Sequence, residues 1–471
     1  MKTTIVILLF LAILKADFVF GQTNELLTNT QKSWVAKANR HEKNGWTYLH
    51  IEGTPQERGF QHGYLMSGEI KEAIRVLNVK WTHQTALDWN WYVQKTGEIF
   101  THKVDPENLA EIDGIVEGMK AAGVQTSRDE IVGLNGYVEL MGDWWSSVKD
   151  SIKSFAPPYP KESCSSFIAT GSMTKDGKIV LGHNTMDGYF NPQCNIILDI
   201  LPEKGHRILM QSISGFIHSE TDFFITDAGL VGSETTIGDF KSFDIKGDPE
   251  FTRMRHATQY ASNIEEWCEM MKKNNNGGYA NAWLIGDINT NEIARLELGL
   301  KFIGYEKKKD GFFIGSNVAE DLKILRFETG RDETNIKLSS IARRVRWKQL
   351  MKENVGKIDI KLAQVFEADH YDSYRKKKIP GGRSLCGHWE LDPQYDGVYV
   401  PFNPEGTVDG KVVDAKMARN MSFSAKWGSS CGKAFNAKKF LEEHPQFYWM
   451  DGLLVDRPKQ PWTVFKAGEV N

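Results

Sequence analysis

The pattern of apolar residues changes abruptly at one proline-containing segment in the first half of the chain. Residues 147–162 carry Pro157, Pro158 and Pro160, which cannot continue a helix and predict an exposed loop. Before this loop, apolar residues recur three and four positions apart; after it, short strand-like runs alternate with helical ones. The fold must therefore join a helical N-terminal third to a mixed remainder, which favours stacked sheets covered by helices.

The two parts predict different elements. Helices are expected at 57–101, 106–122 and 127–145 before the loop, and at 249–274 and 339–354 after it. Strands are expected at 46–52, 165–170, 178–182, 195–201, 206–214, 223–225, 230–234, 282–287, 293–298 and 312–316. The turn Lys175-Asp176-Gly177 predicts a hairpin between the two strands that follow the loop. Without any internal repeat, we expect residues 22–163 and 164–471 to form one structural domain.

The chain begins like an exported protein. Lys2 precedes an apolar run over residues 5–14, and Val19 and Gly21 have the spacing that a signal peptidase accepts. Ten apolar residues are too few to span a bilayer comfortably, so no stable membrane insertion is expected. We expect residues 1–21 to be a removed signal peptide and the mature protein to be secreted, periplasmic or in a lysosome-like compartment.

The composition excludes some partners. The formal net charge is -3, with 58 basic and 61 acidic residues, so nothing indicates binding to nucleic acid. His183 with His206 or His218 lacks the tight spacing of a metal-ligand set. We therefore expect neither a metal nor a cofactor.

Five cysteines are an odd number for an exported protein: Cys164, Cys194, Cys268, Cys386 and Cys431. They are too few for a disulfide scaffold in a chain of this length, and one must stay free or pair with another molecule. Cys164 is our candidate for that cysteine. A Cys386–Cys431 disulfide stays open, because sequence alone does not fix the geometry.

Cys164 lies where the exposed loop meets a predicted strand. If the Ser163–Cys164 bond is cut, Cys164 gains an α-amino group with an ordinary pKa of about 7.7–8.0. Such an amine can act as the base for the thiol of the same residue near neutral pH. The alternative is a small apolar cysteine in the core.

Polar residues follow in two later segments. The hairpin returns 182–187 beside Cys164, where Asp187 could orient an amine and His183 and Asn184 could bind substrate or an oxyanion. Asn281 enters a predicted strand and could donate its amide to an oxyanion, a contribution of several kcal/mol to a transition state. The alternatives are a polar turn and a structural asparagine.

Taken together, these segments resemble the phospholipase B-like proteins and the penicillin acyltransferase-type cysteine hydrolases, which are N-terminal nucleophile (Ntn) hydrolases. The resemblance rests on Cys-Ser-Ser at 164–166, Gly-His-Asn-Thr at 182–185, FFITDAGLVGSETTI at 223–237, YANAWLIGD at 279–287, Arg-Gly-Phe-Gln-His-Gly at 58–63 and Glu-Ile-Val-Gly-Leu-Asn at 130–135. It implies an α+β fold, the αββα sandwich of two antiparallel sheets between helical layers. It also implies autocatalytic cleavage before Cys164 and chains that remain associated.

The resemblance assigns roles as well. It implies hydrolysis of amide or ester bonds of acylated small molecules or lipids through an acyl-thioester on Cys164. His183 and Asn184 match positions that line the site, and Asn281 matches the oxyanion asparagine. The other matched residues are Asp187, which lies one residue further from Asn184 than in the acyltransferases; Glu234 or Thr235, near a second oxyanion position; and Arg383, a site-ordering arginine. The competing hypothesis is a noncatalytic secreted binding protein that kept the fold.

Overall fold

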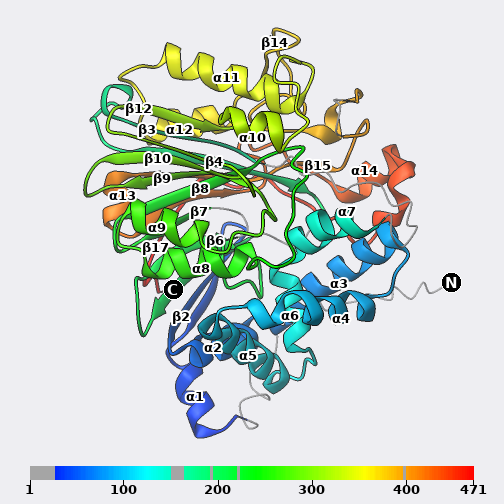
Figure 1. Cartoon of the computed structure of the whole chain (residues 1–471). Helices are drawn as coiled ribbons and strands as arrows, with labels where there is room; N and C mark the ends of the chain where they lie inside the picture. The colour runs from blue at the N-terminus through cyan, green and yellow to red at the C-terminus, as the bar shows by residue number, and fades with distance from the viewer. Residues whose placement is uncertain (1–26, 150–163, 191–194, 220–222, 396–398, 471) are drawn as a thin grey trace, which may run out of the picture.

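The computed structural model describes residues 27–149, 164–190, 195–219, 223–395 and 399–470. Two β-sheets stack face to face, with α11 (Ser339–Glu353) and α12 (Ile360–Glu367) on one side and α8 (Glu250–Tyr260) and α9 (Ile264–Lys272) on the other (Figure 1). The expected αββα sandwich is therefore confirmed. The expected signal peptide at 1–21 and Ser163 lie outside the described residues.

The first sheet contains β3, the strand that begins directly after Cys164. Its six strands run in the order β12 (Gly311–Gly315), β3 (Ser165–Thr170), β4 (Val180–Gly188), β15 (Glu405–Asp414), β16 (Ser422–Trp427) and β17 (Thr463–Lys466). All neighbours in this sheet are antiparallel. The predicted hairpin is the β3–β4 pair, and it places the polar segment after Gly182 beside the start of β3.

The second sheet has nine strands, and it is mixed rather than purely antiparallel. Its order is β1 (Asn39–Lys43), β2 (Trp46–Gly53), β5 (Ile196–Pro202), β6 (Ile208–Ser212), β7 (Phe223–Thr226), β8 (Leu230–Thr236), β9 (Asn281–Asp287), β10 (Glu292–Leu298) and β11 (Ile303–Lys308). The pair β2–β5 is parallel. A parallel pair needs a long crossover connection, and the N-terminal helices lie in that connection.

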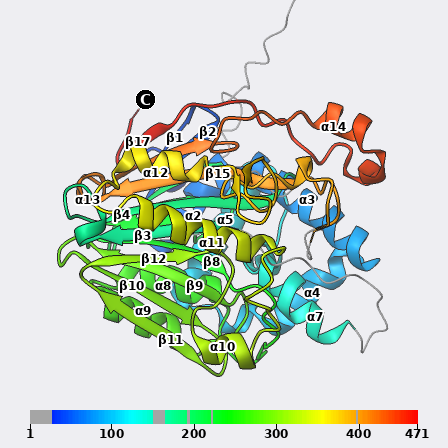
Figure 2. The same ribbon diagram turned by 90° about the horizontal axis from the view of Figure 1, so that it is seen from above.

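Side chains of the strands alternate between the interior of the sandwich and the outer face that the helices cover. On β3, Ile168 packs between the sheets with Leu284, whereas Phe167 packs on the outer face against Trp347 of α11 and Phe366 of α12. Successive strand residues point to opposite faces, so both faces of this sheet are buried. Figure 2 shows α11 and α12 lying over the strands of this sheet.

The N-terminal third forms more helices than its apolar spacing predicts. The expected helix at 57–101 is three helices, α2 (Pro55–Leu65), α3 (Ser67–Thr85) and α4 (Trp89–Ile99). Ala86 takes a left-handed conformation (φ +59°) that ends α3, and the Asp88 side chain accepts from the Trp91 N–H to cap α4. The remaining N-terminal elements are α1 (Asn29–Val35), α5 (Pro106–Ala121), α6 (Arg128–Asn135), the π-helix Glu139–Trp144 and α7 (Trp145–Val148).

Helices α2 and α5 touch through glycines. A Cβ on Gly59 would lie 1.9 Å from the Glu111 carbonyl oxygen, and one on Gly63 would lie 2.1 Å from that of Ile115. Both values are far below van der Waals contact, so a larger residue would force the helices apart. The glycines of the 58–63 motif therefore set the spacing of this helix pair.

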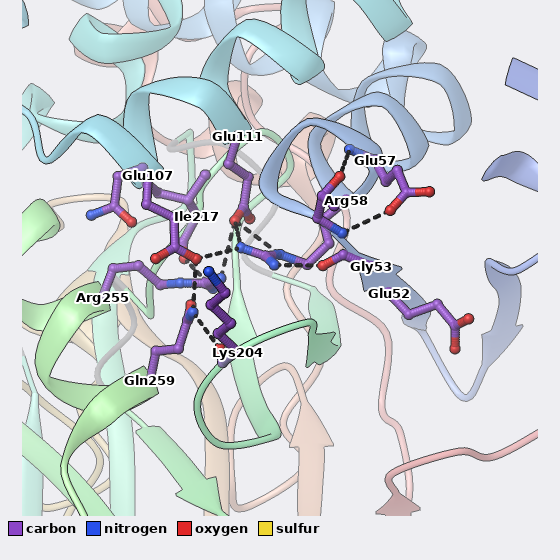
Figure 3. A network of polar contacts seen from close by, with 12 residues as sticks. Glu52, Gly53, Glu57, Arg58, Glu107, Glu111, Lys204, Ile217, Arg255 and Gln259 are labelled. Atoms are coloured by element: carbon purple, nitrogen blue, oxygen red, sulfur yellow. Dashed lines mark hydrogen bonds and ion pairs between the residues drawn. The ribbon is translucent and has the colours of Figure 1, made fainter. Parts of the chain in front are cut away.

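Buried charges secure the same helix pair (Figure 3). Arg58 and Arg255 both donate to Oε2 of Glu111, at 2.8 and 3.0 Å. Arg58 also donates to the Gly53 carbonyl at the end of β2, and Arg255 donates to the Ile217 carbonyl. This network ties α2, α5 and α8 to the nine-stranded sheet.

The C-terminal part was the least predictable. Strand β11 and helix α12 lie in segments where no such element was expected, and β15 has ten residues where the sequence after Arg383 indicated loops with short strands. The other elements here are α10 (Leu322–Phe327), β13 (Tyr371–Asp372), β14 (Lys377–Lys378), α13 (Ala415–Arg419) and α14 (Ala437–Glu443). Among the described helices, none is long and apolar enough to cross a membrane.

Candidate active site at the start of strand β3

Cys164 is buried directly before β3, with a relative exposure of 2%. Its backbone φ is +90°, outside the regions that residues with a Cβ normally occupy. Such a conformation costs on the order of 1–3 kcal/mol and persists where surrounding contacts enforce it. The strain lies at the residue whose N-terminal bond is the predicted cleavage site.

The Cys164 carbonyl is held by Arg343, which Asn317 in turn orients. Arg343 of α11 donates from Nη1 to the Cys164 carbonyl oxygen at 2.6 Å and from Nη2 to Oδ1 of Asn317 at 2.7 Å. Asn317 in turn donates to the Thr236 carbonyl at the end of β8, at 2.8 Å. This chain of hydrogen bonds connects Cys164 on one sheet to the end of a strand in the other.

The end of β8 and the start of β9 hold several buried polar groups that have no hydrogen-bond partner in the described part of the chain. Asn281 pairs with Thr236 across the two strands. Within the described residues, the nitrogen and the oxygen of the Asn281 side-chain amide have no hydrogen-bond partner. The hydroxyl groups of Thr235 and Thr236 have none there either. Buried polar groups are normally bonded, so a cluster of unbonded ones indicates a place where a ligand or water binds.

The strand ends bring this cluster close to the segment of Cys164. A Cβ on Gly315 would lie 2.6 Å from the Thr235 hydroxyl oxygen, and Gly315 pairs with Ser166 on β3. Ser166 also lies 2.7 Å from Ser233 of β8, oxygen to oxygen. The structure therefore brings the predicted residues Cys164, Thr235 and Asn281 to one end of the stacked sheets.

His183 pairs with Ser166 and lies between the sheets. Burial, and then the charge of Lys411, lower the pKa of His183 well below its usual value, so the ring is neutral near pH 7. A neutral ring can donate from Nε2 to the Glu234 carbonyl, 3.0 Å away. His183 thus joins β4 to β8 as a hydrogen-bonding residue of the interior.

Asn184 faces the opposite side of β4. Its Nδ2 donates to the carbonyls of Glu367 and Leu385, at 2.8 and 2.9 Å, and its Oδ1 accepts from Ser430 at 2.5 Å. The amide thus holds the end of α12 and two loops against the sheet. Asp187 lies three residues further along β4, partly buried, and accepts from the Gly188 N–H.

Glu234 and Arg383 have partners outside this cluster. Glu234 accepts from the Tyr279 hydroxyl at 2.8 Å. Arg383 is buried, donates to the Lys337 carbonyl and lies 3.4 Å from Asp392. Neither residue therefore shares a hydrogen-bond partner with Cys164 or Asn281 in these contacts.

Two groups were not expected from the sequence. Arg343 donates to the Cys164 carbonyl from 179 residues away in the chain, and Asn317, its second partner, lies 26 residues before Arg343. The only sequence signal is an arginine on the apolar face of the predicted helix 339–354, beside Ile341 and Ala342. A buried charge of that kind needs a partner, although the sequence does not say which.

A second unexpected group contains ligands suited to a metal. One atom each from His370, Cys386, His388 and Cys431 lie within 4.8 Å of one another. Neither Cys386 nor Cys431 forms a disulfide. The expectation of no metal site rested on histidine spacing alone and missed this cluster, whose ligands come from separate loops.

A family model described as Phospholipase B matches residues 33–303, more than half of the chain. The chain therefore belongs to the phospholipase B family, within the class of α+β proteins with two stacked sheets. The chain is also similar to a solved structure, a variant of conjugated bile acid hydrolase from Clostridium perfringens, at 11% identity and a TM-score of 0.33, with 65% of this chain and 98% of that one covered.

Curated relatives match over part of their length. Phospholipase B-like protein C of Dictyostelium discoideum is 24% identical over 59% of this chain and 56% of its own. Putative phospholipase B-like 2 of Caenorhabditis elegans is 22% identical over 52% and 48%, and an uncharacterized protein of Archaeoglobus fulgidus is 27% identical over 50% and 40%. The chain thus spans about half the length of the curated relatives it matches.

Proposed function

We propose that this protein is an exported Ntn cysteine hydrolase that cuts itself before Cys164 and then cleaves amide or ester bonds of acylated substrates. The observation that carries the proposal is the strained Cys164 at the start of β3, near the buried polar groups of Thr235, Thr236 and Asn281, which have no hydrogen-bond partner among the described residues. Membership of the phospholipase B family supports a hydrolase.

Self-cleavage would begin with the thiol of Cys164. The sulfur adds to the carbonyl carbon of Ser163, the carbon–nitrogen bond breaks, and the nitrogen takes a proton to become the α-amine. Water then hydrolyses the resulting thioester and releases the Ser163 carboxylate and the thiol. The positive φ at Cys164 favours this route, because breaking the bond relieves backbone strain.

The mature site would use the new amine as its base. The α-amine takes the thiol proton, the thiolate attacks the acyl carbonyl, and the Asn281 amide donates to the oxyanion that forms. The leaving group then takes the proton from the ammonium, and water hydrolyses the acyl-thioester. Asp187 is the candidate for holding the ammonium, and Arg343 and Asn317 act as positioning residues for Cys164.

The proposed substrates are acylated small molecules or lipids. Several relatives carry the name phospholipase B-like, which favours a lipid ester, and the bond cleaved can equally be an acyl amide under this chemistry. A series of acyl esters and acyl amides with one shared acyl chain would rank the two bond types by kcat/KM.

The decisive test compares wild type with Cys164→Ala, and with Cys268→Ala as a matched control. Cys268 is also buried, and burial raises its pKa to about 12, so its thiol should be inert. Wild type and Cys268→Ala should yield fragments near 22–163 and 164–471 and react with an acyl probe. A Cys164→Ala protein that is still cleaved and active would refute the proposal.

A further inference from the structure

We propose that His370, Cys386, His388 and Cys431 bind one structural Zn²⁺ ion that fastens three loops behind the strand of Cys164. These four side chains form the Cys₂His₂ set that tetrahedral zinc sites use. Their ligand atoms lie within 4.8 Å of one another although they come from three separate loops.

The distances fit a tetrahedral ion. Nε2 of His388 lies 3.5 Å from Sγ of Cys386 and 3.4 Å from Sγ of Cys431. With zinc–sulfur bonds of about 2.3 Å and zinc–nitrogen bonds of about 2.0–2.1 Å, a tetrahedral site separates sulfur and nitrogen by about 3.6 Å. These two distances already fit, and only ligand atoms further apart, up to 4.8 Å, would have to move closer together.

The surroundings orient the ligands as a metal site requires. Nδ1 of His388 lies 2.8 Å from Oε1 of Glu390, which leaves Nε2 for the ion. The Lys433 N–H donates to Sγ of Cys431 at 3.3 Å, a contact that favours a thiolate. Among the residues with described placement, the buried Nε2 of His370 has no hydrogen-bond partner.

A disulfide between Cys386 and Cys431 is the competing arrangement in an exported protein. A disulfide would involve neither histidine, and it would not explain why both histidines lie beside the cysteines or why His388 contacts Glu390. In zinc sites a carboxylate typically accepts from the histidine ring nitrogen that does not bind the metal, as Glu390 does here. The four-ligand set therefore explains more of the cluster than a disulfide does.

Solvent reaches the cluster through a surface cavity of about 520 Å³, whose lining includes His370, Ser430 and Lys378. Cys386 and His388 are buried, whereas His370 and Cys431 are partly exposed on the side nearer solvent. An ion can therefore enter after folding. Four protein ligands leave no open position, so the role is structural rather than catalytic.

Asn184 connects the proposed zinc site to the proposed active site. Its amide bonds to the Leu385 carbonyl and the Ser430 hydroxyl, and each of these residues directly precedes a cysteine ligand. Asn184 pairs with Ser165, the residue after Cys164. Zinc binding should therefore stabilise the outer wall of the strand that carries the nucleophile.

Metal analysis of the tag-free, full-length protein tests the proposal. Wild type, purified without chelators, should hold about one zinc per chain, and Cys386→Ser should lower the zinc content about tenfold or more. Glu390→Gln, which keeps all four ligands, should weaken zinc affinity by about 10- to 100-fold. Cys268→Ser, a buried cysteine of α9, should retain full zinc content.

Cobalt gives a second readout that needs no variant. Wild type reconstituted with Co²⁺ should show thiolate-to-cobalt charge-transfer absorption and the visible bands of tetrahedral cobalt. Two outcomes would overturn the proposal: wild type that stays metal-free after incubation with Zn²⁺, or a peptide map that finds Cys386 and Cys431 joined as a disulfide.

Discussion

Replacing Asn281 by leucine should separate activity from stability. Both polar atoms of this buried side chain have no hydrogen-bond partner within the described part of the chain. A buried group left unbonded costs about 1–3 kcal/mol, so an apolar side chain of similar size should raise the free energy of unfolding by up to that amount. If the amide donates to the oxyanion, kcat should fall by about 10²–10³.

Urea denaturation and the hydrolysis rate of a chromogenic acyl ester measure the two effects on one protein. Asn135→Leu is the matched control, because the Asn135 amide is buried but makes three hydrogen bonds, to Ile131, Gly215 and Ile217. The control should lose stability. An Asn281→Leu protein that keeps wild-type kcat, or that is destabilised as the control is, would refute this reasoning.

Three further predictions concern packing, pH and processing. Gly59→Ala should lower the free energy of unfolding by about 1–3 kcal/mol, because its Cβ would meet backbone of α5, whereas Gly68→Ala, which faces open space, should not; urea denaturation compares the two. Burial raises the pKa of Glu250 from 4.5 to about 8 in the folded protein. Protonation of Glu250 therefore contributes its full amount to the free energy of unfolding below pH 4.5, and this contribution is lost as the pH rises to about 8. Between about pH 6.5 and pH 8.5 the Tm of wild type should fall, and that of Glu250→Gln should fall less; equal slopes would contradict the assignment. Arg343→Lys should fold but self-cleave about tenfold more slowly, since one ammonium cannot replace the fork that holds both Cys164 and Asn317; unchanged processing in a pulse-chase would exclude this positioning role.

Local signals predicted the part of the fold nearest Cys164. The turn at 175–177 and the alternating residues around it specify the β3–β4 hairpin without help from the rest of the chain. The position and length of strand β15 were not predicted, because it is buried at nearly all positions and yet includes the charged residues Lys411 and Asp409. These two charges are satisfied by each other at 2.7 Å, a compensation that only tertiary structure reveals.

Some residues of the candidate site could be found from the sequence, and others could not. Cys164 and Asn281 stand in the sequence where predicted strands begin, and the family resemblance assigned a role to each of them. Arg343 and Asn317 could not be found, because their contacts join segments far apart in the chain. Asn184 was predicted to line the site, yet its hydrogen bonds hold loops on the outer face, and strand alternation explains why it differs from His183.

The mass and N-terminal sequence of the purified wild-type protein test the central claim most directly. The account predicts two associated chains, the second beginning at Cys164, and a single uncut chain for Cys164→Ala. A wild-type protein that remains one chain from the signal-peptide site to residue 471, with a thiol at Cys164 that no acyl probe labels, would contradict it.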